Sequence, residues 1–158
     1  RNNNLNTTIH AGEAFGPESI HQAIHTCGAN RIGHGIRLLE DPELLSYVNN
    51  HRICLEICIT SNFHTGAVES LKEHPFIYYY NKGVRVCLNT DNRLISNTNL
   101  SKEYLIACQL FNLNLNDIRE IIIMSMKSAF IAHQERKRLI KLLSNKLEND
   151  FGITSSYT

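Results

Sequence analysis

Four short apolar runs recur along the chain, and each ends in a polar residue that precedes a helical segment. These polar tips are His10, His34, Ser61 and Asp91, which are 24, 27 and 30 residues apart. A strand, a helix and the next parallel strand occupy about 30 residues. The spacing therefore predicts consecutive β/α units of one parallel sheet.

The expected strands and helices follow from this repeat. The strands are expected near residues 5–9, 30–32, 53–59 and 84–88. Helices are expected from Pro17, where the missing N–H of proline costs little, and from Asp41. The remaining helical patterns lie at about residues 74–80, 100–112, 116–130 and 134–149. Asn116 is expected to cap the helix at 116–130.

The polar tips all follow the carboxyl ends of their strands. In parallel β/α folds, functional sites are built at that edge, because the loops converge there beyond a packed interior. Four β/α units are half of an eight-stranded barrel, whose usual length is about 250 residues. Half a barrel is therefore the favoured fold, and a small doubly wound sheet is the alternative.

Composition excludes several classes of protein. The 158 residues carry a net charge of +1, so no nucleic-acid or anionic-membrane partner is expected. No apolar run approaches the 18 or so residues that a membrane helix needs. The five cysteines contain no C-x-x-C pair, which argues against a disulfide framework or a cysteine-rich zinc site. Free thiols in a reducing cytoplasm are expected instead. The chain begins at Arg1, and we expect it to be a piece of a longer protein.

Four short motifs carry the chemistry. They are His-Ala-Gly-Glu at 10–13, Arg-Ile-Gly-His-Gly at 31–35, Cys-Ile-Thr-Ser-Asn at 58–62 and Asn-Thr-Asp-Asn at 89–92. Each motif alone is weak evidence, but their order and spacing together are specific. From about Thr8 to the end of the last helix, the set resembles the adenosine deaminase family of the amidohydrolase superfamily.

The resemblance implies a fold and domain boundaries. It corresponds to strands five to eight of that family's TIM-type (β/α)8 barrel. Residues 1–150 are then the C-terminal part of a deaminase barrel, and residues 151–158 are a tail.

The resemblance also implies roles for individual residues. His10 and Asp91 match zinc ligands, and imidazole nitrogen and carboxylate oxygen both suit Zn²⁺. Glu13 matches the glutamate that gives a proton to purine N1. His34 matches the catalytic histidine beside the metal-bound water. Asp91 is also expected to be catalytic, as the acceptor of the proton from that water.

Three residues are candidates for substrate binding: Gly12, Ser61 and Asn92. Asn92 departs from the family, which commonly has a second aspartate in this position. Purine N7 is a hydrogen-bond acceptor, and an asparagine amide can donate to it without first being protonated. Ser61 and its neighbour Asn62 are expected to support the pocket, with capping of the strand end as the alternative.

The implied reaction is zinc-dependent hydrolytic deamination of adenosine, or deoxyadenosine, in purine salvage. The family's other two zinc ligands form an H-x-H pair on the first barrel strand, and this chain contains no such pair. The purine nucleoside substrate and the missing N-terminal half of the barrel are therefore the expected partners. The chain by itself is expected to be inactive.

Three alternatives remain open. The substrate could instead be adenine, AMP or an N6-modified purine. Gly33 before His34 favours a nucleoside, because adenine deaminases more often carry aspartate and AMP deaminases often carry serine there. A degraded half barrel that serves as a non-catalytic interaction module is the alternative from another class. His21 and His25 are a weaker candidate metal pair, for which surface positions are the better interpretation.

Overall fold

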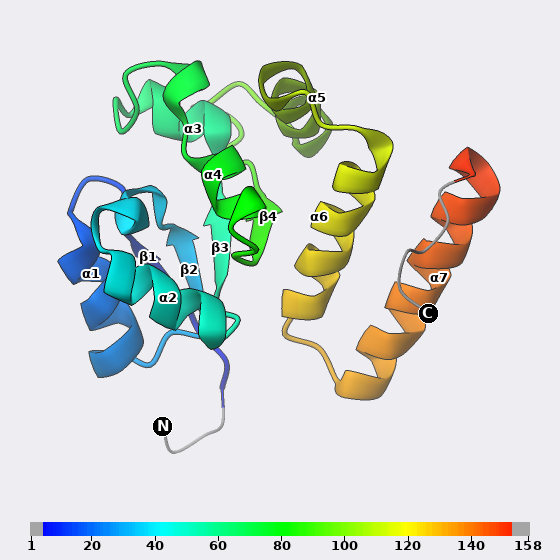
Figure 1. The fold of residues 1–158 in the computed structure, drawn as a ribbon, viewed down its shortest axis with the longest axis horizontal. Helices are drawn as coiled ribbons and strands as arrows, with labels where there is room; N and C mark the ends of the chain where they lie inside the picture. Colours follow the sequence, from blue (N-terminus) through cyan, green and yellow to red (C-terminus); the bar gives the residue numbers. More distant parts are fainter. Residues whose placement is uncertain (1–4, 153–158) are drawn as a thin grey trace.

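A four-stranded parallel sheet forms the centre of the computed structural model, which describes residues 5–152. Its strands follow one another in sequence order, so that each pairs with the next along the chain. A doubly wound sheet would reverse direction at a switch point. The sequential order is that of a barrel, and β1 and β4 are the two edges (Figure 1). The strands are β1 (Thr8–Ala11), β2 (Arg31–His34), β3 (Cys54–Ile57) and β4 (Val86–Leu88).

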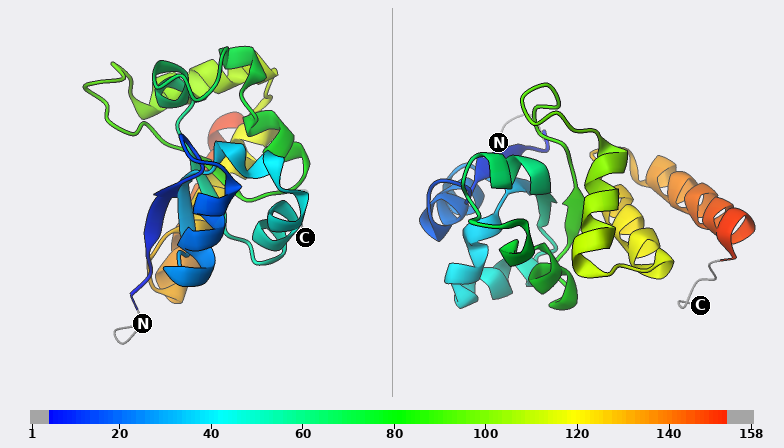
Figure 2. Two further views of the ribbon diagram at one scale, coloured as in Figure 1. Left: turned by 90° about the vertical axis from the view of Figure 1, so that its left-hand side faces the viewer. Right: turned by 90° about the horizontal axis from the view of Figure 1, so that it is seen from above.

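Helices connect the strands and then continue beyond the sheet. Seen from above, α6 and α7 extend from the β4 side of the sheet, away from α1 and α2 (Figure 2). Helix α6 packs against β4, and α7 packs against α6. The helical elements are α1 (Pro17–His21), the π-helical turn η1 (Gln22–Thr26), the 3-10 turn η2 (Ile36–Glu40), α2 (Pro42–Asn50), α3 (Ile59–His64), the 3-10 turn η3 (Leu71–Glu73), α4 (Phe76–Asn81), α5 (Leu100–Phe111), α6 (Leu115–Ser128) and α7 (His133–Phe151).

The two faces of the sheet have different chemistry because side chains alternate along each strand. One face carries Ile32, Leu55 and Val86, which are fully buried against the helices. The other face is polar: on it the Arg31 Nε lies 2.8 Å from the Glu56 Oε1. The apolar face is the outside of a barrel wall, and the polar face is its interior.

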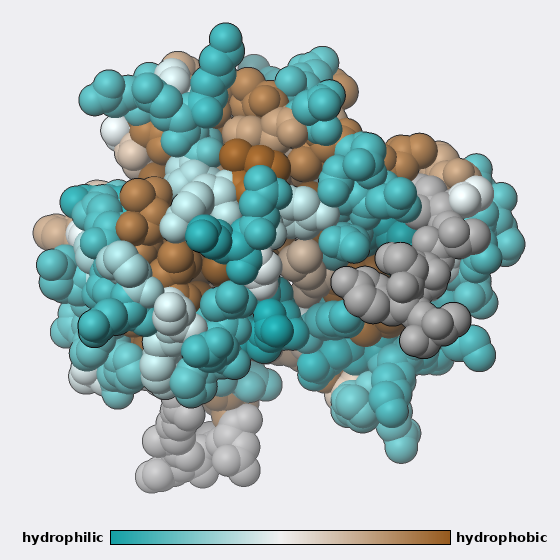
Figure 3. All heavy atoms as spheres, viewed as in Figure 1, coloured by the Kyte–Doolittle hydropathy of each residue, from teal (hydrophilic) through white to brown (hydrophobic). Residues whose placement is uncertain are grey.

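The outer surface of the molecule is mostly polar on the side drawn in Figure 3. Hydrophilic residues cover most of the face in Figure 3, and hydrophobic ones show mainly over the upper helices and beside α2. Tyr79 of α4 is fully buried, and its hydroxyl donates to the Ile36 carbonyl at 2.7 Å. No helix within residues 5–152 is both long enough and apolar enough to cross a membrane.

Two expectations need correction. The cap of α6 is Asn114 and not Asn116, because the Asn114 side chain accepts from the Asn116 and Asp117 amides, and Asp117 completes a capping box. The third strand ends at Ile57, and Ser61 lies inside the short helix α3 rather than at the strand's end. Of the expected tail, Phe151 is the last residue of α7, and residues 153–158 lie outside the described part of the chain.

The loops after β1 and β2 approach each other closely at two glycines. Gly12 and Gly35 both have φ of +68°, in the region that favours glycine. A Cβ on Gly12 would lie 2.4 Å from the Ile20 Cδ1 and 3.1 Å from the Gly35 Cα. The absence of a side chain at Gly12 therefore lets the two loops that carry the polar tips meet.

Gly12→Ala is expected to destabilise the chain by about 2–4 kcal/mol, because left-handed strain and overpacking add. Gly83→Ala is the matched control. Gly83 has φ of +74° but nothing within 4 Å of its Cβ position, so only strain of about 1–2 kcal/mol is expected. Urea denaturation measures both variants. Equal losses would contradict the close approach of the loops.

Candidate active site

The predicted site residues converge at the carboxyl edge of the sheet. His10 lies in β1, His34 ends β2, and Asp91 follows β4. All three line one cavity of about 390 Å³, together with the interior residue Glu56. A larger cavity of about 550 Å³ lies beside α6 and α7, and none of the predicted site residues lines it. The chemistry therefore belongs to the smaller cavity.

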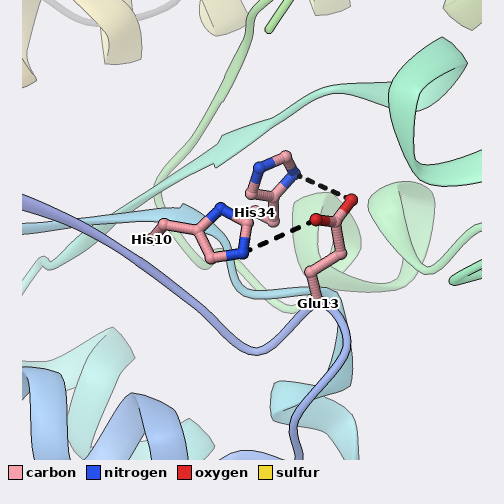
Figure 4. A group of neighbouring side chains, drawn as sticks. All are labelled: His10, Glu13 and His34. Carbon is pink, nitrogen blue, oxygen red and sulfur yellow. Dashed lines mark ion pairs between the residues drawn. The ribbon is translucent and has the colours of Figure 1, made fainter. Parts of the chain in front are cut away.

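The Glu13 carboxylate faces two imidazoles, one with each of its oxygens (Figure 4). One carboxylate oxygen lies 3.6 Å from the His10 Nε2, and the other lies 3.5 Å from the His34 Nδ1. The two rings meet edge to face with centroids 4.6 Å apart. The His10 side chain is 64% exposed, whereas the Glu13 side chain is 9% exposed. The cluster thus presents an open imidazole in front of a buried carboxylate.

His34 and Asp91 both adopt left-handed backbone conformations, with φ of 68° and 51°. Such values are uncommon for residues other than glycine, and they concentrate at functional sites. Alternation along β2 would place the His34 side chain on the same face as Ile32, in the core. It lines the cavity beside His10 instead. The change of backbone conformation at the strand's end accompanies this redirection.

A buried amide holds the cluster together. The Asn62 Nδ2 donates to the Glu13 Oε1 at 2.7 Å and lies 3.0 Å from the His34 Nδ1. The Thr65 hydroxyl donates to the same carboxylate oxygen at 3.1 Å. The Asn62 Oδ1 in turn lies 3.1 Å from the Nε2 of His74. Asn62 and His74 are 0% and 1% exposed, so both side chains are shielded from solvent.

His74 and Thr65 are the residues of this network that the sequence reasoning missed. His74 stands in the loop before α4 and Thr65 directly after α3, so neither lies at a strand's end. The available signal was the His74-Pro75 pair before a helix, which does not by itself indicate a polar contact. Asn62 was expected only to support the pocket.

The other predicted residues have clear partners. The Ser61 hydroxyl donates to the Asp91 Oδ2 at 2.8 Å, so it orients the carboxylate. The Asn92 Oδ1 accepts from the amides of Leu94 and Ile95, both at 3.1 Å. This capping contact uses the oxygen of the Asn92 amide and leaves its NH₂ group available as a donor.

Gly12 has both backbone polar groups engaged. Its N–H donates to the Ser19 Oγ at 2.9 Å, and its carbonyl accepts from the Arg37 amide at 3.0 Å.

His21 and His25 lie on the exposed side of α1 and η1, with rings 4.3 Å apart. Within residues 5–152, the His10, Glu13 and His34 group is the only set of three or more histidine, cysteine or acidic side chains close enough to share an ion.

Burial keeps two histidines of the site neutral. Desolvation lowers the pKa of His74 to about 4, and the nearby His34 adds to the shift. Desolvation also lowers the pKa of His34, although the Glu13 carboxylate opposes this. At neutral pH both rings are therefore uncharged and each carries a single N–H.

Acid is expected to destabilise the fold through His74. The unfolded chain binds a proton at this residue near pH 6.5, whereas the folded chain does so only near pH 4. The contribution to the free energy of unfolding is therefore fully present above pH 6.5 and is lost as the pH falls towards 4. At pH 5 the loss is about 2 kcal/mol. Urea denaturation at pH 7 and pH 5 measures it, and His74→Gln should reduce the difference by that amount.

Comparison with known proteins places the chain in one family. Residues 1–146 match the family described as adenosine deaminase. The adenosine deaminase of Mycobacterium ulcerans is 46% identical, over a match that covers 89% of this chain and 42% of the relative. The chain thus spans less than half the length of the curated relatives it matches.

Solved structures agree. The adenine deaminase of Arthrobacter aurescens superposes with a TM-score of 0.87 at 23% identity, covering 91% of this chain and 44% of that one, and shows the shared fold. The N6-methyl-AMP deaminase of Arabidopsis thaliana has a TM-score of 0.80 at 28% identity, covering 91% and 42%. These likenesses make the four-stranded sheet one half of a deaminase barrel, and the chain belongs to the adenosine deaminase family.

Proposed function

We propose that this chain carries the C-terminal half of the active site of a zinc-dependent deaminase that converts adenosine or deoxyadenosine into inosine or deoxyinosine and ammonia. One observation carries the proposal. His10, His34 and Asp91 line a single cavity at the carboxyl edge of the sheet, and the Glu13 carboxylate contacts both imidazoles. This combination supplies metal-ligand types, a proton donor and a hydrogen-bonding imidazole within one site.

His10 and Asp91 are the residues that would hold Zn²⁺. The donor set fits, because imidazole nitrogen and carboxylate oxygen are both zinc ligands and both side chains reach the same cavity. The hydrogen bond from Ser61 to Asp91 is the kind of second contact that orients a ligating carboxylate. Bound zinc would supply an activated water at neutral pH.

Side chains of this chain carry out proton transfer, hydrogen bonding to the attacking oxygen and purine binding. Glu13 gives a proton to purine N1 while C6 is attacked. Asp91 accepts the proton of the attacking water. His34 faces the same cavity and forms a hydrogen bond with the oxygen that arrives at C6. The free NH₂ group of Asn92 donates to purine N7, and Gly12 leaves room for the ring.

Adenosine is the preferred substrate in this proposal. The adenosine deaminase of Mycobacterium ulcerans is 46% identical, whereas the adenine and N6-methyl-AMP deaminases share only 23% and 28% identity. Gly33 packs beside His10, and a Cβ there would lie 3.4 Å from the His10 Cα. The first atom of a side chain would thus be at van der Waals contact here, so no clash at Cβ requires glycine at this position.

A substrate panel tests the proposal. The intact protein that carries this chain, loaded with zinc, is offered adenosine, deoxyadenosine, AMP, N6-methyl-AMP and adenine, and ammonia release is measured. Fastest turnover of the nucleosides supports the proposal. A preference for AMP, N6-methyl-AMP or adenine would mean that the protein is a deaminase of that substrate and not of adenosine. No turnover of any of the five would favour a non-catalytic module.

We also propose that the 158-residue chain alone does not catalyse the reaction. His10 and Asp91 provide two ligands, and catalytic zinc sites usually have three from the protein. In the described residues, β1 and β4 each pair on one side only, so the barrel interior is open. Incubation of the purified chain with zinc and adenosine should yield no inosine above background. All five cysteines are free thiols, which supports a reducing cytoplasm as the setting. Purine salvage is the role that the proposed substrate implies.

A further inference from the structure

A chain of buried hydrogen bonds leads from the backbone of α4 to two catalytic groups of the site, Glu13 and His34. It runs from the Phe76 amide to His74, then to Asn62, and from Asn62 to Glu13 and His34. We propose that His74 and Asn62 are positioning residues, which orient the Glu13 carboxylate and select the tautomer of His34. This inference rests on the proposed function and assigns a task to residues that touch neither substrate nor metal.

The direction of each hydrogen bond follows from the first one. A backbone amide can only donate, so the Phe76 N–H, 3.1 Å away, requires the His74 Nδ1 to accept. A neutral His74 then carries its proton on Nε2 and donates to the Asn62 Oδ1 at 3.1 Å. The NH₂ group of Asn62 must therefore face the other way, towards Glu13 and His34.

The opposite orientation of the Asn62 amide is unfavourable at both ends. A flip would set its NH₂ group against the Nε2–H of His74 and its carbonyl oxygen against the Glu13 carboxylate. Asn62 is fully buried, so no water in a neighbouring solvent layer can relieve either repulsion. His74 thus fixes the orientation of an amide whose two ends are otherwise similar in shape.

The fixed amide determines how His34 meets the substrate. One N–H of Asn62 points at the His34 Nδ1 at 3.0 Å, so this nitrogen accepts. A neutral His34 then carries its proton on Nε2, and its ring lines the cavity beside His10. His34 therefore presents a donor to the cavity, suited to an oxygen that gains negative charge during attack.

The same amide selects which oxygen of Glu13 is available. The Oε1 accepts from Asn62 at 2.7 Å and from Thr65 at 3.1 Å. The Oε2 lies on the side of His10, 3.6 Å from its Nε2. Because Oε1 already accepts two hydrogen bonds, the Oε2 is the oxygen left to carry and release a proton.

Three variants of the intact zinc-loaded protein test the positioning role. His74→Leu removes the Nε2–H donor, and kcat for adenosine is expected to fall by about 10- to 100-fold with little change in KM. His74→Gln restores an N–H donor near the same place and should return kcat to within about threefold of the parent. His64→Leu, at an exposed position of α3, is the matched control and should leave kcat unchanged.

Two further measurements separate positioning from a purely structural role. Nitrogen-15 NMR of the imidazoles should show His34 as the Nε2–H tautomer in the parent and a mixture of tautomers in Asn62→Ala. Zinc content should be the same in all variants, because neither residue contacts His10 or Asp91. The tautomer readout requires no turnover, so it tests the inference even if the proposed deaminase activity is absent.

The inference is overturned by either of two results. One is equal loss of kcat in His74→Leu and His74→Gln, which would mean that only the packing of the ring matters. The other is an unchanged His34 tautomer in Asn62→Ala. A variant that fails to fold is recognised by its circular dichroism, and the Gln variant then carries the comparison with the parent.

Discussion

Glu13→Gln is expected to lower kcat for adenosine about 100- to 10,000-fold in the intact zinc-loaded protein. The amide keeps the shape of the side chain, and its oxygen can still accept from Asn62 and Thr65, as the Glu13 Oε1 does at 2.7 and 3.1 Å. It has no acidic proton to give to purine N1. Because the surroundings of the residue are retained, KM should change by only a few fold. Steady-state kinetics with adenosine measures both constants.

Glu43→Gln is the matched control for this substitution. Glu43 is exposed in the first turn of α2, and it does not line the cavity shared by His10, His34 and Asp91. Its replacement should leave kcat and KM unchanged. A kcat for Glu13→Gln within threefold of the parent would remove Glu13 from the role of proton donor and leave it as a scaffold for the two histidines.

The second large effect is expected for Glu103→Leu, which should destabilise the chain by about 3 kcal/mol or more. Glu103 of α5 is fully buried. One carboxylate oxygen accepts from the Thr98 hydroxyl at 2.7 Å, and the other accepts from the Thr60 amide at 3.2 Å. The leucine leaves both donors buried without a partner. Urea denaturation of the chain measures the difference in the free energy of unfolding.

Glu103→Gln separates the loss of the charge from the loss of the two hydrogen bonds. The glutamine oxygen can accept from the Thr60 amide, and its NH₂ group can donate to the Thr98 hydroxyl, which accepts as well as donates. Its loss of stability should lie between those of the parent and Glu103→Leu. Equal stability of the two variants would show that the carboxylate charge, rather than the hydrogen bonds, determines the effect. Because Thr60 adjoins Ser61, the same contact anchors the segment that holds Asp91.

Most of the secondary structure could be predicted from local patterns. Strands and helices were expected close to where they occur, because the apolar runs and helix-starting residues are encoded within a few neighbouring positions. The cap of α6 was misplaced, since Asn114 and Asn116 are chemically identical and only their backbone angles decide which one caps. The third strand is shorter than the expected range of 53–59. Ile59 is β-prone by composition, but this residue begins α3.

The sequence by itself determined which chemical groups this protein brings to the carboxyl edge of its sheet. His10, Glu13, His34 and Asp91 each belong to a short motif next to a strand, and in a parallel sheet those strand ends lie together. Only the tertiary structure decided what holds these groups in place. Asn62 and His74 come from separate segments, and their partnership depends on how α3 and the loop before α4 pack over the end of β2. Hydrogen bonds of this kind leave no periodic pattern, because their geometry arises only when distant backbone segments meet.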